Sequence, residues 1–376
     1  MQAQSPIFTR QDGKMFLKKL QLKNFRNYAS QEALFAPGMN IITGDNAQGK
    51  TNLLDAILLT SLGKCHRAAK DKELIRWGEE RASVTADAEK RFGDETAEVV
   101  LDRAAGKAVA VNGMPVAKLG ELMGVVATVL FSPDQMRIVK DAPGERRRFM
   151  DIALCQLSKP YFYLLNRYNR IVAQRNKLVK SGHASADALD VWDMQLAREG
   201  AKIVKTRRGF IARLGAEAAD AHRFLSGEKE TLTLSYEGIE GDDVKTAEEN
   251  FLEKLAATRE SDLKMGFTHV GPQRDDMRIE INGIDARTFG SQGQQRTAAL
   301  SLKLAELRLA RAETGESPIL LLDDVLSELD PMRQRQLLSL VDVQTIITCT
   351  HISAEIRDTL SEFRLYKVVA GQLYDG

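Results

Sequence analysis

Residues 44–51 have the types and spacing needed to bind the phosphates of a nucleotide. They read Gly-Asp-Asn-Ala-Gln-Gly-Lys-Thr, which satisfies the GxxxxGK[ST] pattern of a phosphate-binding loop. The glycines let backbone N–H groups turn toward phosphate oxygens, while Lys50 can reach the terminal phosphates and Thr51 a Mg²⁺ ion. The predicted nucleotide-binding residues of this loop are Gly44, Asp45, Asn46, Ala47, Gln48, Gly49, Lys50 and Thr51.

A second run near the other end of the chain supplies carboxylates for the same site. Residues 319–322 are all apolar, as in strands buried on both faces, and Asp323 and Asp324 follow them. Asp323 can hold the same Mg²⁺ ion as Thr51, and Asp324 can orient or deprotonate a water molecule. The fold must therefore bring two distant parts of the chain together.

The segments around the phosphate-binding run predict an α/β lobe. An apolar stretch at 39–42 precedes the run and a helix-like stretch at 52–62 follows it, which is the strand-loop-helix context that such a loop requires. Residues 16–24 alternate apolar and charged side chains and indicate an edge strand, and 81–111 supply further alternating segments.

The middle of the chain changes to helical periodicity. From 159 to about 226 apolar residues recur at helix spacing, and a break at 181–185 divides this stretch into two long antiparallel helices. Alternation resumes at 232–237, 246–259 indicates a charged helix, and 277–281 indicates one arm of a hairpin; the chain then returns to complete the sheet. The predicted organisation is a disordered extension at 1–14, a first part of the nucleotide-binding lobe at 15–150, an inserted helical lobe at 151–265, and the second part at 266–376.

Bulk composition excludes some classes of protein. With 376 residues, 43% of them hydrophobic and 28% charged, the chain is an ordinary globular sequence with room for two or three lobes. No apolar run approaches the length of a membrane span, and residues 1–14 lack the apolar core of a signal peptide. Three widely spaced cysteines form no disulfide or metal-binding pattern, which indicates a reducing cytoplasm.

Positive charge is concentrated in the predicted helical lobe. The net charge is only +1, yet no acidic residue occurs between Asp151 and Asp187. Cations on two adjacent helices suit the phosphates of DNA, and a merely solvated helix face gives the same pattern. The basic stretch at 64–76 carries too much charge for a core, and is either a DNA-facing surface or a solvated loop. The candidate DNA-binding residues are Lys64, Arg67, Lys70, Arg167, Arg170, Arg175, Lys177, Lys205 and Arg208.

Residues 289–296 form a candidate anion site. They read Phe-Gly-Ser-Gln-Gly-Gln-Gln-Arg and precede an amphipathic helix predicted at 297–312. A helix N-terminus preceded by Ser and Gly presents free N–H groups and a hydroxyl, which can close on a phosphate. In isolation the run reads as an N-cap and a turn, but its position between the two nucleotide-binding runs favours the phosphate contact.

The order of these motifs resembles the ABC ATPase superfamily, and the whole chain from residue 16 resembles the RecF family of its SMC-like members. Gln273 departs from the family, which usually has histidine there, and Asp324 departs from ABC proteins at large, where glutamate is common. The runs that carry the resemblance are 22–28, 72–78, 131–134, 146–151 and 271–276.

The resemblance implies an α/β fold: an ABC-type ATPase head, with a mixed sheet and the phosphate-binding loop, and an inserted helical lobe of antiparallel helices. It implies that His351 senses the γ-phosphate and that Arg26 lies near the nucleotide, although a structural histidine and a solvated arginine fit the same positions. The signature and D-loop residues that would act on a second subunit's nucleotide are Ser291, Gln292, Gly293, Gln294 and Asp330.

The implied function is that of an ATP-dependent DNA-binding protein in recombinational and gap repair. ATP and Mg²⁺ would join two subunits into a homodimer that clamps double-stranded DNA near single-strand gaps, weak hydrolysis would reopen it, and a RecR-type mediator would be its partner in recombinase loading. The nucleotide-binding subunit of a membrane transporter shares the motifs. However, Thr51 and Ser291 are 240 positions apart, as an inserted lobe requires. A small-molecule kinase would leave the signature and D-loop without a role.

Overall fold

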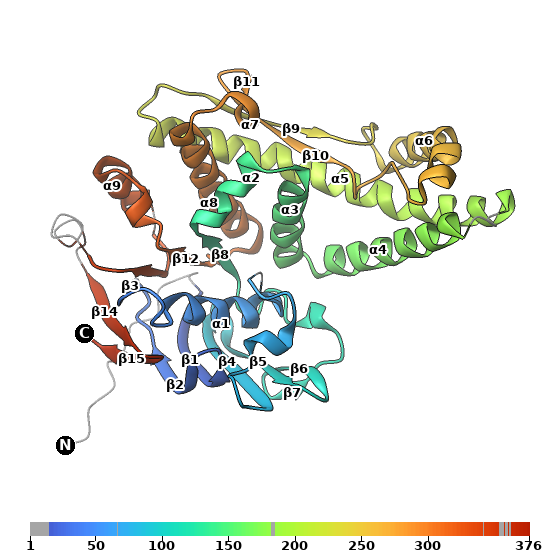
Figure 1. Cartoon of the computed structure of the whole chain (residues 1–376). Coiled ribbons are helices and arrows are strands. Elements are labelled where there is room, and N and C mark those ends of the chain that lie inside the picture. The colour runs from blue at the N-terminus through green and yellow to red at the C-terminus, as the bar shows by residue number, and fades with distance from the viewer. Residues whose placement is uncertain are drawn as a thin grey trace. The chain divides into compact units, whose positions relative to one another are not determined.

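Two compact units make up the chain (Figure 1). The computed structural model describes residues 15–65, 67–181, 185–340, 342–352, 357, 360 and 362–376. One unit comprises Met1–Gln135 with Glu306–Gly376, and the other comprises Met136–Ala305. The extension predicted at 1–14 lies outside the described residues. No helix in the described part of the chain has the length and apolarity that a membrane span needs.

The first unit contains a six-stranded mixed sheet in the order β15-β14-β3-β13-β12-β8. The five strands from β14 to β8 run parallel, and β15 is antiparallel at the edge. Every residue of β8, β12 and β13 is buried, as expected for apolar strands covered on both faces. The strands are β3 (Met39–Thr43), β8 (Thr128–Phe131), β12 (Ile319–Asp323), β13 (Thr345–Cys349), β14 (Phe363–Val369) and β15 (Gln372–Asp375).

A second sheet of the same unit is antiparallel, in the order β2-β1-β4-β5-β6-β7. β1 lies between β2 and β4, so the prediction of an edge strand at 16–24 was wrong. The alternation of apolar and charged residues indicates that one face of β1 is buried, and Leu20 and Leu22 lie in the core. It does not indicate whether the strand lies at the edge or inside the sheet. The strands are β1 (Phe16–Phe25), β2 (Tyr28–Leu34), β4 (Arg81–Lys90), β5 (Gly93–Asp102), β6 (Gly106–Val111) and β7 (Met114–Pro115).

Helix α1 (Lys50–Leu62) contacts strands of both sheets: β1, β4 and β5 of one, and β12 and β13 of the other. Residues Leu53–Ser61 are all buried, and a helix that is buried all round has no polar face. The hydrophobic core therefore extends through the helix and fixes the phosphate-binding loop that precedes it. The unit also contains α9 (Pro331–Leu340).

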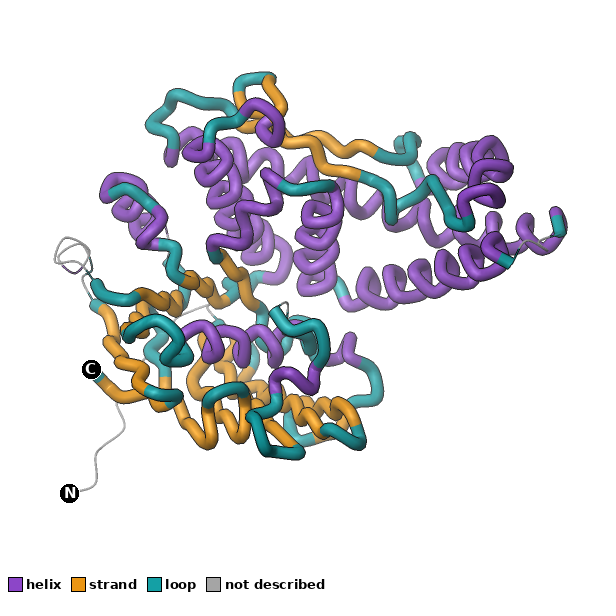
Figure 2. The backbone as a smooth tube through the Cα atoms, in the orientation of Figure 1, coloured by secondary structure: helices purple, strands orange, loops and turns teal. Residues whose placement is uncertain are grey.

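The second unit is mainly helical, with one three-stranded sheet in the order β11-β10-β9 (Figure 2). The two long helices predicted from the periodicity are α4 and α5, and Ser185 caps α5 by accepting from Ala188 N. The elements are α2 (Arg137–Lys140), α3 (Pro143–Leu157), α4 (Lys159–Lys180), α5 (Ala186–Leu225), β9 (Leu232–Glu237), α6 (Val244–Met265), β10 (Asp276–Ile281), β11 (Ile284–Asp285), α7 (Ala286–Phe289) and α8 (Gln292–Thr314).

The boundaries of this unit differ from the predicted helical lobe at 151–265. The unit begins at Met136 and ends at Ala305. β9 packs on α5, β10 pairs with β9, and α3 contacts β10, so the flanking segments share one set of packing contacts with the helices. The first part of α8 consequently belongs to the second unit, and the rest of α8 belongs to the first.

Candidate nucleotide site

The phosphate-binding loop connects β3 to α1 in a conformation that its glycines make possible. Gly49 has φ 121°, and a Cβ there would lie 2.6 Å from Asn27 Nδ2. Gly44 has φ 153°, and its Cβ would lie 2.5 Å from the carbonyl oxygen of Val368. Lys50, only 8% exposed, donates to the carbonyls of Gly44 at 2.5 Å and Asp45 at 2.8 Å. Its ammonium group therefore lies against the loop that it is predicted to serve.

Asn27 in the turn between β1 and β2, and Tyr28 at the start of β2, hold this loop from outside. Asn27 Nδ2 donates to the Gln48 carbonyl at 2.8 Å, and Asn52 Nδ2 donates to Asn27 Oδ1 at 2.9 Å. Tyr28 OH donates to the Gly49 carbonyl at 3.0 Å. Burial raises the pKa of Tyr28, so its hydroxyl keeps the proton it donates. Sequence reasoning missed both roles, although Asn27 and Tyr28 belong to the family-like run at 22–28.

Asp323 lies beside the loop, at the end of β12. Thr51 Oγ1 donates to its two carboxylate oxygens at 3.1 and 3.3 Å, and Thr348 Oγ1 donates to Oδ1 at 2.6 Å. The two runs that predicted one site are thus brought together by the parallel sheet. A threonine hydroxyl and a carboxylate are oxygen ligands that could hold Mg²⁺. No cluster of three or more His, Cys, Asp or Glu side chains suited to a metal occurs among the described residues.

Arg67 contacts this same carboxylate, which corrects its prediction as a DNA-binding residue. Arg67 Nη1 lies 2.8 Å from Asp323 Oδ2, and Nη2 lies 3.6 Å from Asp134 Oδ2. Its half-buried guanidinium is therefore directed into the candidate nucleotide site and paired there. The other two candidates of the 64–76 segment, Lys64 and Lys70, are exposed.

Asp324 follows Asp323 with a left-handed backbone, at φ 53°. Its N–H donates to the Thr348 carbonyl at 3.0 Å. Its Oδ1 atom is buried and has no hydrogen-bond partner among the described residues. Since buried polar atoms are normally paired, this carboxylate has spare acceptor capacity for a water or substrate proton.

Arg26 and His351 lie in different surroundings. Arg26 Nη2 lies 3.7 Å from Asp55 Oδ2, and Nη1 donates to the Glu73 carbonyl at 3.3 Å. Burial raises the pKa of the Asp55 carboxyl, and the charges of Arg67 and Arg26 oppose that rise. His351 follows β13 and is exposed, with Nδ1 3.2 Å from Thr350 Oγ1. That Arg26 and His351 contact the nucleotide remains a prediction.

The signature residues lie in the second unit, at the N-terminus of α8. Ser291, Gln292 and Gly293 are exposed. Ser291 Oγ accepts from Gln294 N at 3.2 Å, and Gln294 Oε1 accepts from Ser291 N at 2.9 Å. These reciprocal bonds form a capping box, so both the N-cap interpretation and the exposed anion site are compatible with the geometry.

Asp330, the D-loop residue, caps α9. Its Oδ1 accepts from Arg333 N at 3.0 Å, and its Oδ2 pairs with Arg333 Nη1 at 2.6 Å. The hydrogen bond from the Arg333 backbone holds the pKa of the Asp330 carboxyl below its usual value. Asp330 is thus ionised and held at the start of its helix.

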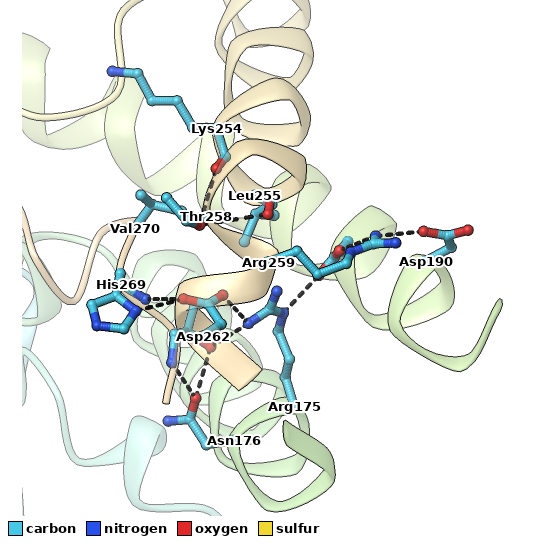
Figure 3. A network of polar contacts seen from close by, with 12 residues as sticks. Arg175, Asn176, Asp190, Lys254, Leu255, Thr258, Arg259, Asp262, His269 and Val270 are labelled. Carbon is cyan, nitrogen blue, oxygen red and sulfur yellow. Dashed lines mark hydrogen bonds and ion pairs between the residues drawn. The ribbon is translucent and has the colours of Figure 1, made fainter. Parts of the chain in front are cut away.

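Arg175, predicted to track a DNA backbone, is instead fully buried between α4, α5 and α6 (Figure 3). Its Nε lies 2.6 Å from Asp193 Oδ1, and its Nη1 lies 2.6 Å from Asp262 Oδ2. Breaking a buried pair leaves a charge uncompensated, so this arginine is committed to joining the helices. The spacing of Ile171, Arg175 and Val179 at i, i+4 and i+8 places Arg175 on the apolar face of α4, a signal present in the sequence.

The remaining candidate DNA-binding residues of the second unit differ in how exposed their side chains are. Arg170, Lys177 and Lys205 are exposed, as is Arg167, whose Nη1 lies 3.3 Å from Glu199 Oε1. Arg208 is half-buried and donates to the carbonyls of Ile239, at 2.8 Å, and Gly241. The exposed cations lie on α4 and α5, where their charge is available to an anionic partner.

Comparison with known proteins adds a family assignment. The RecF/RecN/SMC N terminal domain family matches residues 16–371. The DNA replication and repair protein RecF of Agathobacter rectalis is 45% identical over 363 residues, covering 96% of this chain and 99% of that protein.

Two solved structures have the same fold over nearly the whole chain. One, described as the recombination mediator protein RecF-ATPrS in the RecFOR pathway, has a TM-score of 0.90 at 37% identity, covering 97% of this chain and 99% of that one. The other, described as RecF-ATP in that pathway, has a TM-score of 0.90 at 35% identity, covering 98% and 100%. Both are similar to this chain across both units.

Proposed function

The chain belongs to the RecF family of SMC-like ATPases, and on this premise we propose that it is an ATP-driven DNA clamp of recombinational and replication-gap repair. The observation that carries the proposal is the hydrogen bond from Thr51 to Asp323, because it joins two runs that lie far apart in the sequence into one candidate site. It is an ATPase of DNA replication and repair, and ATP is its nucleotide.

We propose Thr51 and Asp323 as the ligands of Mg²⁺. The supporting fit is chemical, because a hydroxyl and a carboxylate oxygen lie 3.1 Å apart at the start of α1. When bound, Mg²⁺ supplies positive charge that compensates the terminal phosphates. Lys50 adds a second cation from the same helix turn, and Thr348 orients the carboxylate from β13.

Asp324 is proposed to orient the attacking water. Its unpartnered Oδ1 supports this role, since the carboxylate beside it, Asp323, is held by Thr348 and is the proposed Mg²⁺ ligand. An aspartate is one methylene shorter than the glutamate of many ABC proteins, which is consistent with weak hydrolysis. The ATP-bound state then persists long enough to act on DNA.

ATP is proposed to join two subunits about a two-fold axis, with the signature loop of each subunit closing on the nucleotide of the other. The exposed Ser291, Gln292 and Gly293, at a helix N-terminus, support an anion-binding role. The closed dimer clamps double-stranded DNA near a single-strand gap, with a RecR-type mediator as partner. Its proposed place is the cytoplasm, in keeping with three free, buried cysteines.

Sedimentation of the wild-type chain and of Asp324→Asn tests this function. ATP should convert the wild type from monomer to dimer, and gapped duplex DNA should sediment with the dimer. Asp324→Asn keeps the Mg²⁺ ligands, so it should dimerise equally well, yet turn over ATP at least about a hundredfold more slowly. Its dimer should persist after the wild type has exhausted its ATP.

A wild type that stays monomeric with ATP and DNA would overturn the clamp. Normal turnover by Asp324→Asn would instead remove only the catalytic role of that carboxylate. Asp242→Asn serves as the matched control, because Asp242 is an exposed aspartate in the connection from β9 to α6, away from the predicted nucleotide and signature residues.

The exposed cations of α4 give a second prediction, on DNA affinity. If Arg170 and Lys177 contact phosphates, each contact releases condensed counterions. The paired change Arg170→Ala with Lys177→Ala should therefore lower the slope of log affinity against log salt by about two units, similarly on all sequences. ATP-driven dimerisation should be unchanged.

The control pair is Lys23→Ala with Lys367→Ala, which removes the same charge from exposed strand positions of the first unit. Measuring DNA affinity against salt concentration for both pairs distinguishes the loss of phosphate contacts from a general loss of positive charge. An unchanged slope for the α4 pair would show a solvated face and direct attention to Lys64 and Lys70.

A further inference from the structure

A continuous path of hydrogen bonds connects the signature loop to the end of α5, entirely within the second unit. Gln294 Oε1 accepts from Ser291 N at 2.9 Å, and Gln294 Nε2 donates to Glu230 Oε1 at 2.9 Å. The other oxygen of that carboxylate, Glu230 Oε2, lies 3.1 Å from His222 Nε2. His222 is in the last turn of α5, and Glu230 is in the connection from α5 to β9.

The histidine end of this path is rigid. His222 is 0% exposed, and its Nδ1 lies 3.2 Å from Ser301 Oγ on α8. Ser301 in turn donates to the Thr297 carbonyl at 2.7 Å. Both ring nitrogens thus have partners, and the imidazole joins α5 to α8. Networks of this kind are strong in a low-dielectric interior when every member is satisfied.

At the other end of the path, both polar atoms of the Gln294 side-chain amide are hydrogen-bonded. A capping box needs only Gln294 Oε1, and in an ordinary box the Nε2 atom would face water. Here Nε2 is bound to a carboxylate, and hydrogen bonds to charged groups are roughly twice as strong as neutral ones. The amide therefore has one orientation, which sets the position of Oε1 and with it Ser291 N.

The same contacts change the prediction for Gln294. Both ends of its side chain are used within its own chain, so the side chain is not available to a second subunit's nucleotide. Ser291, Gln292 and Gly293 are exposed and keep that availability. Gln294 is accordingly a support for the signature loop.

We propose that Glu230 is a positioning residue of the signature loop. Through Gln294 it holds Ser291 in the geometry that closes on the other subunit's ATP, and through His222 it ties this geometry to α5, the helix that carries Lys205. The proposal rests on the proposed action of Ser291 across the dimer. It predicts that ATP-driven dimerisation depends on one hydrogen bond that touches no nucleotide.

Exchanging the two side chains tests the bond. Gln294→Glu keeps the cap, because glutamate serves at this position of a capping box, but it sets two carboxylates against each other. It should weaken ATP-driven dimerisation about tenfold or more. Glu230→Gln alone retains an acceptor for the Gln294 amide and should have a smaller effect. The double variant places carboxylate against amide again, so dimerisation should recover to near the wild-type level.

The measurements are sedimentation at increasing ATP concentration, with thermal unfolding of each ATP-free monomer as the fold check. Glu253→Gln is the matched control, since Glu253 is an exposed carboxylate on α6. Recovery in the double variant supports a specific bond, because a general loss of stability would add up across the two changes. A wild type that does not dimerise overturns the proposed function.

Two results overturn the positioning role while leaving that function intact. One is normal dimerisation by Gln294→Glu in a background where the wild type dimerises. The other is a folded double variant that dimerises no better than Gln294→Glu.

Discussion

Lys50→Ala is expected to abolish ATP-driven dimerisation and hydrolysis together. The Lys50 ammonium is almost buried against the phosphate-binding loop, 2.5 Å from the Gly44 carbonyl oxygen. Removing it leaves the β- and γ-phosphate charges under-compensated. Loss of the charge-assisted hydrogen bonds from this ammonium group to the phosphates should weaken ATP binding about a hundredfold or more.

Equilibrium binding of a fluorescent ATP analogue measures this directly, and sedimentation with ATP measures its consequence. Lys23→Ala is the matched control, because Lys23 is an exposed lysine on β1 of the same unit. Thermal unfolding of the ATP-free protein shows whether the variant is still folded, so that weaker ATP binding can be distinguished from loss of stability. Retained ATP-driven dimerisation by Lys50→Ala would contradict the assignment of the site.

That the two runs of the candidate nucleotide site lie together could be predicted from the sequence, because each run has a local signature. The loop at 44–51 is contiguous, and its glycines are required by its own backbone. The β12 run is apolar throughout because both faces of that strand are buried, so its end could be located at Asp323. Parallel strands then bring the carboxyl ends of β3 and β12 to the same edge of the sheet.

The roles of the arginines could be predicted less well. Charge density alone does not distinguish an exposed arginine from a paired one, so Arg67 and Arg175 were both taken for DNA contacts. The partners of Arg67 include Asp323, far away in the sequence, and no local pattern reports such a pair. For Arg175 a pattern existed, since the helical spacing of its neighbours placed it on the buried face of α4.

The hydrogen bond between Gln294 and Glu230 could not be predicted from the sequence either. A capping box from Ser291 to Gln294 is readable from four consecutive residues. The bond to Glu230 depends on how the connection from α5 to β9 folds back toward the start of α8, which no periodicity encodes. Long-range pairing of this kind follows from packing, so it appears only with the tertiary structure.

The signature loop is expected to act as a contact between subunits. Ser291→Arg should leave the phosphate loop of its own subunit intact, yet abolish the ATP-dependent dimer. A bulky cation would replace the small hydroxyl at the exposed N-terminus of α8, where a γ-phosphate must approach closely. Ser30→Arg is the matched control, because it makes the same change at an exposed position of β2.

Mixing Ser291→Arg with Lys50→Ala subunits shows whether the loop acts across the dimer. Each variant alone should be inactive. A mixed dimer pairs the sound phosphate loop of one subunit with the sound signature loop of the other, so one composite site is complete. Since neither variant pairs with itself and each mixed dimer has one complete site of two, up to about half of wild-type hydrolysis should return. If instead the signature loop served its own subunit, no pairing would restore a site, and the mixture would stay as inactive as its components.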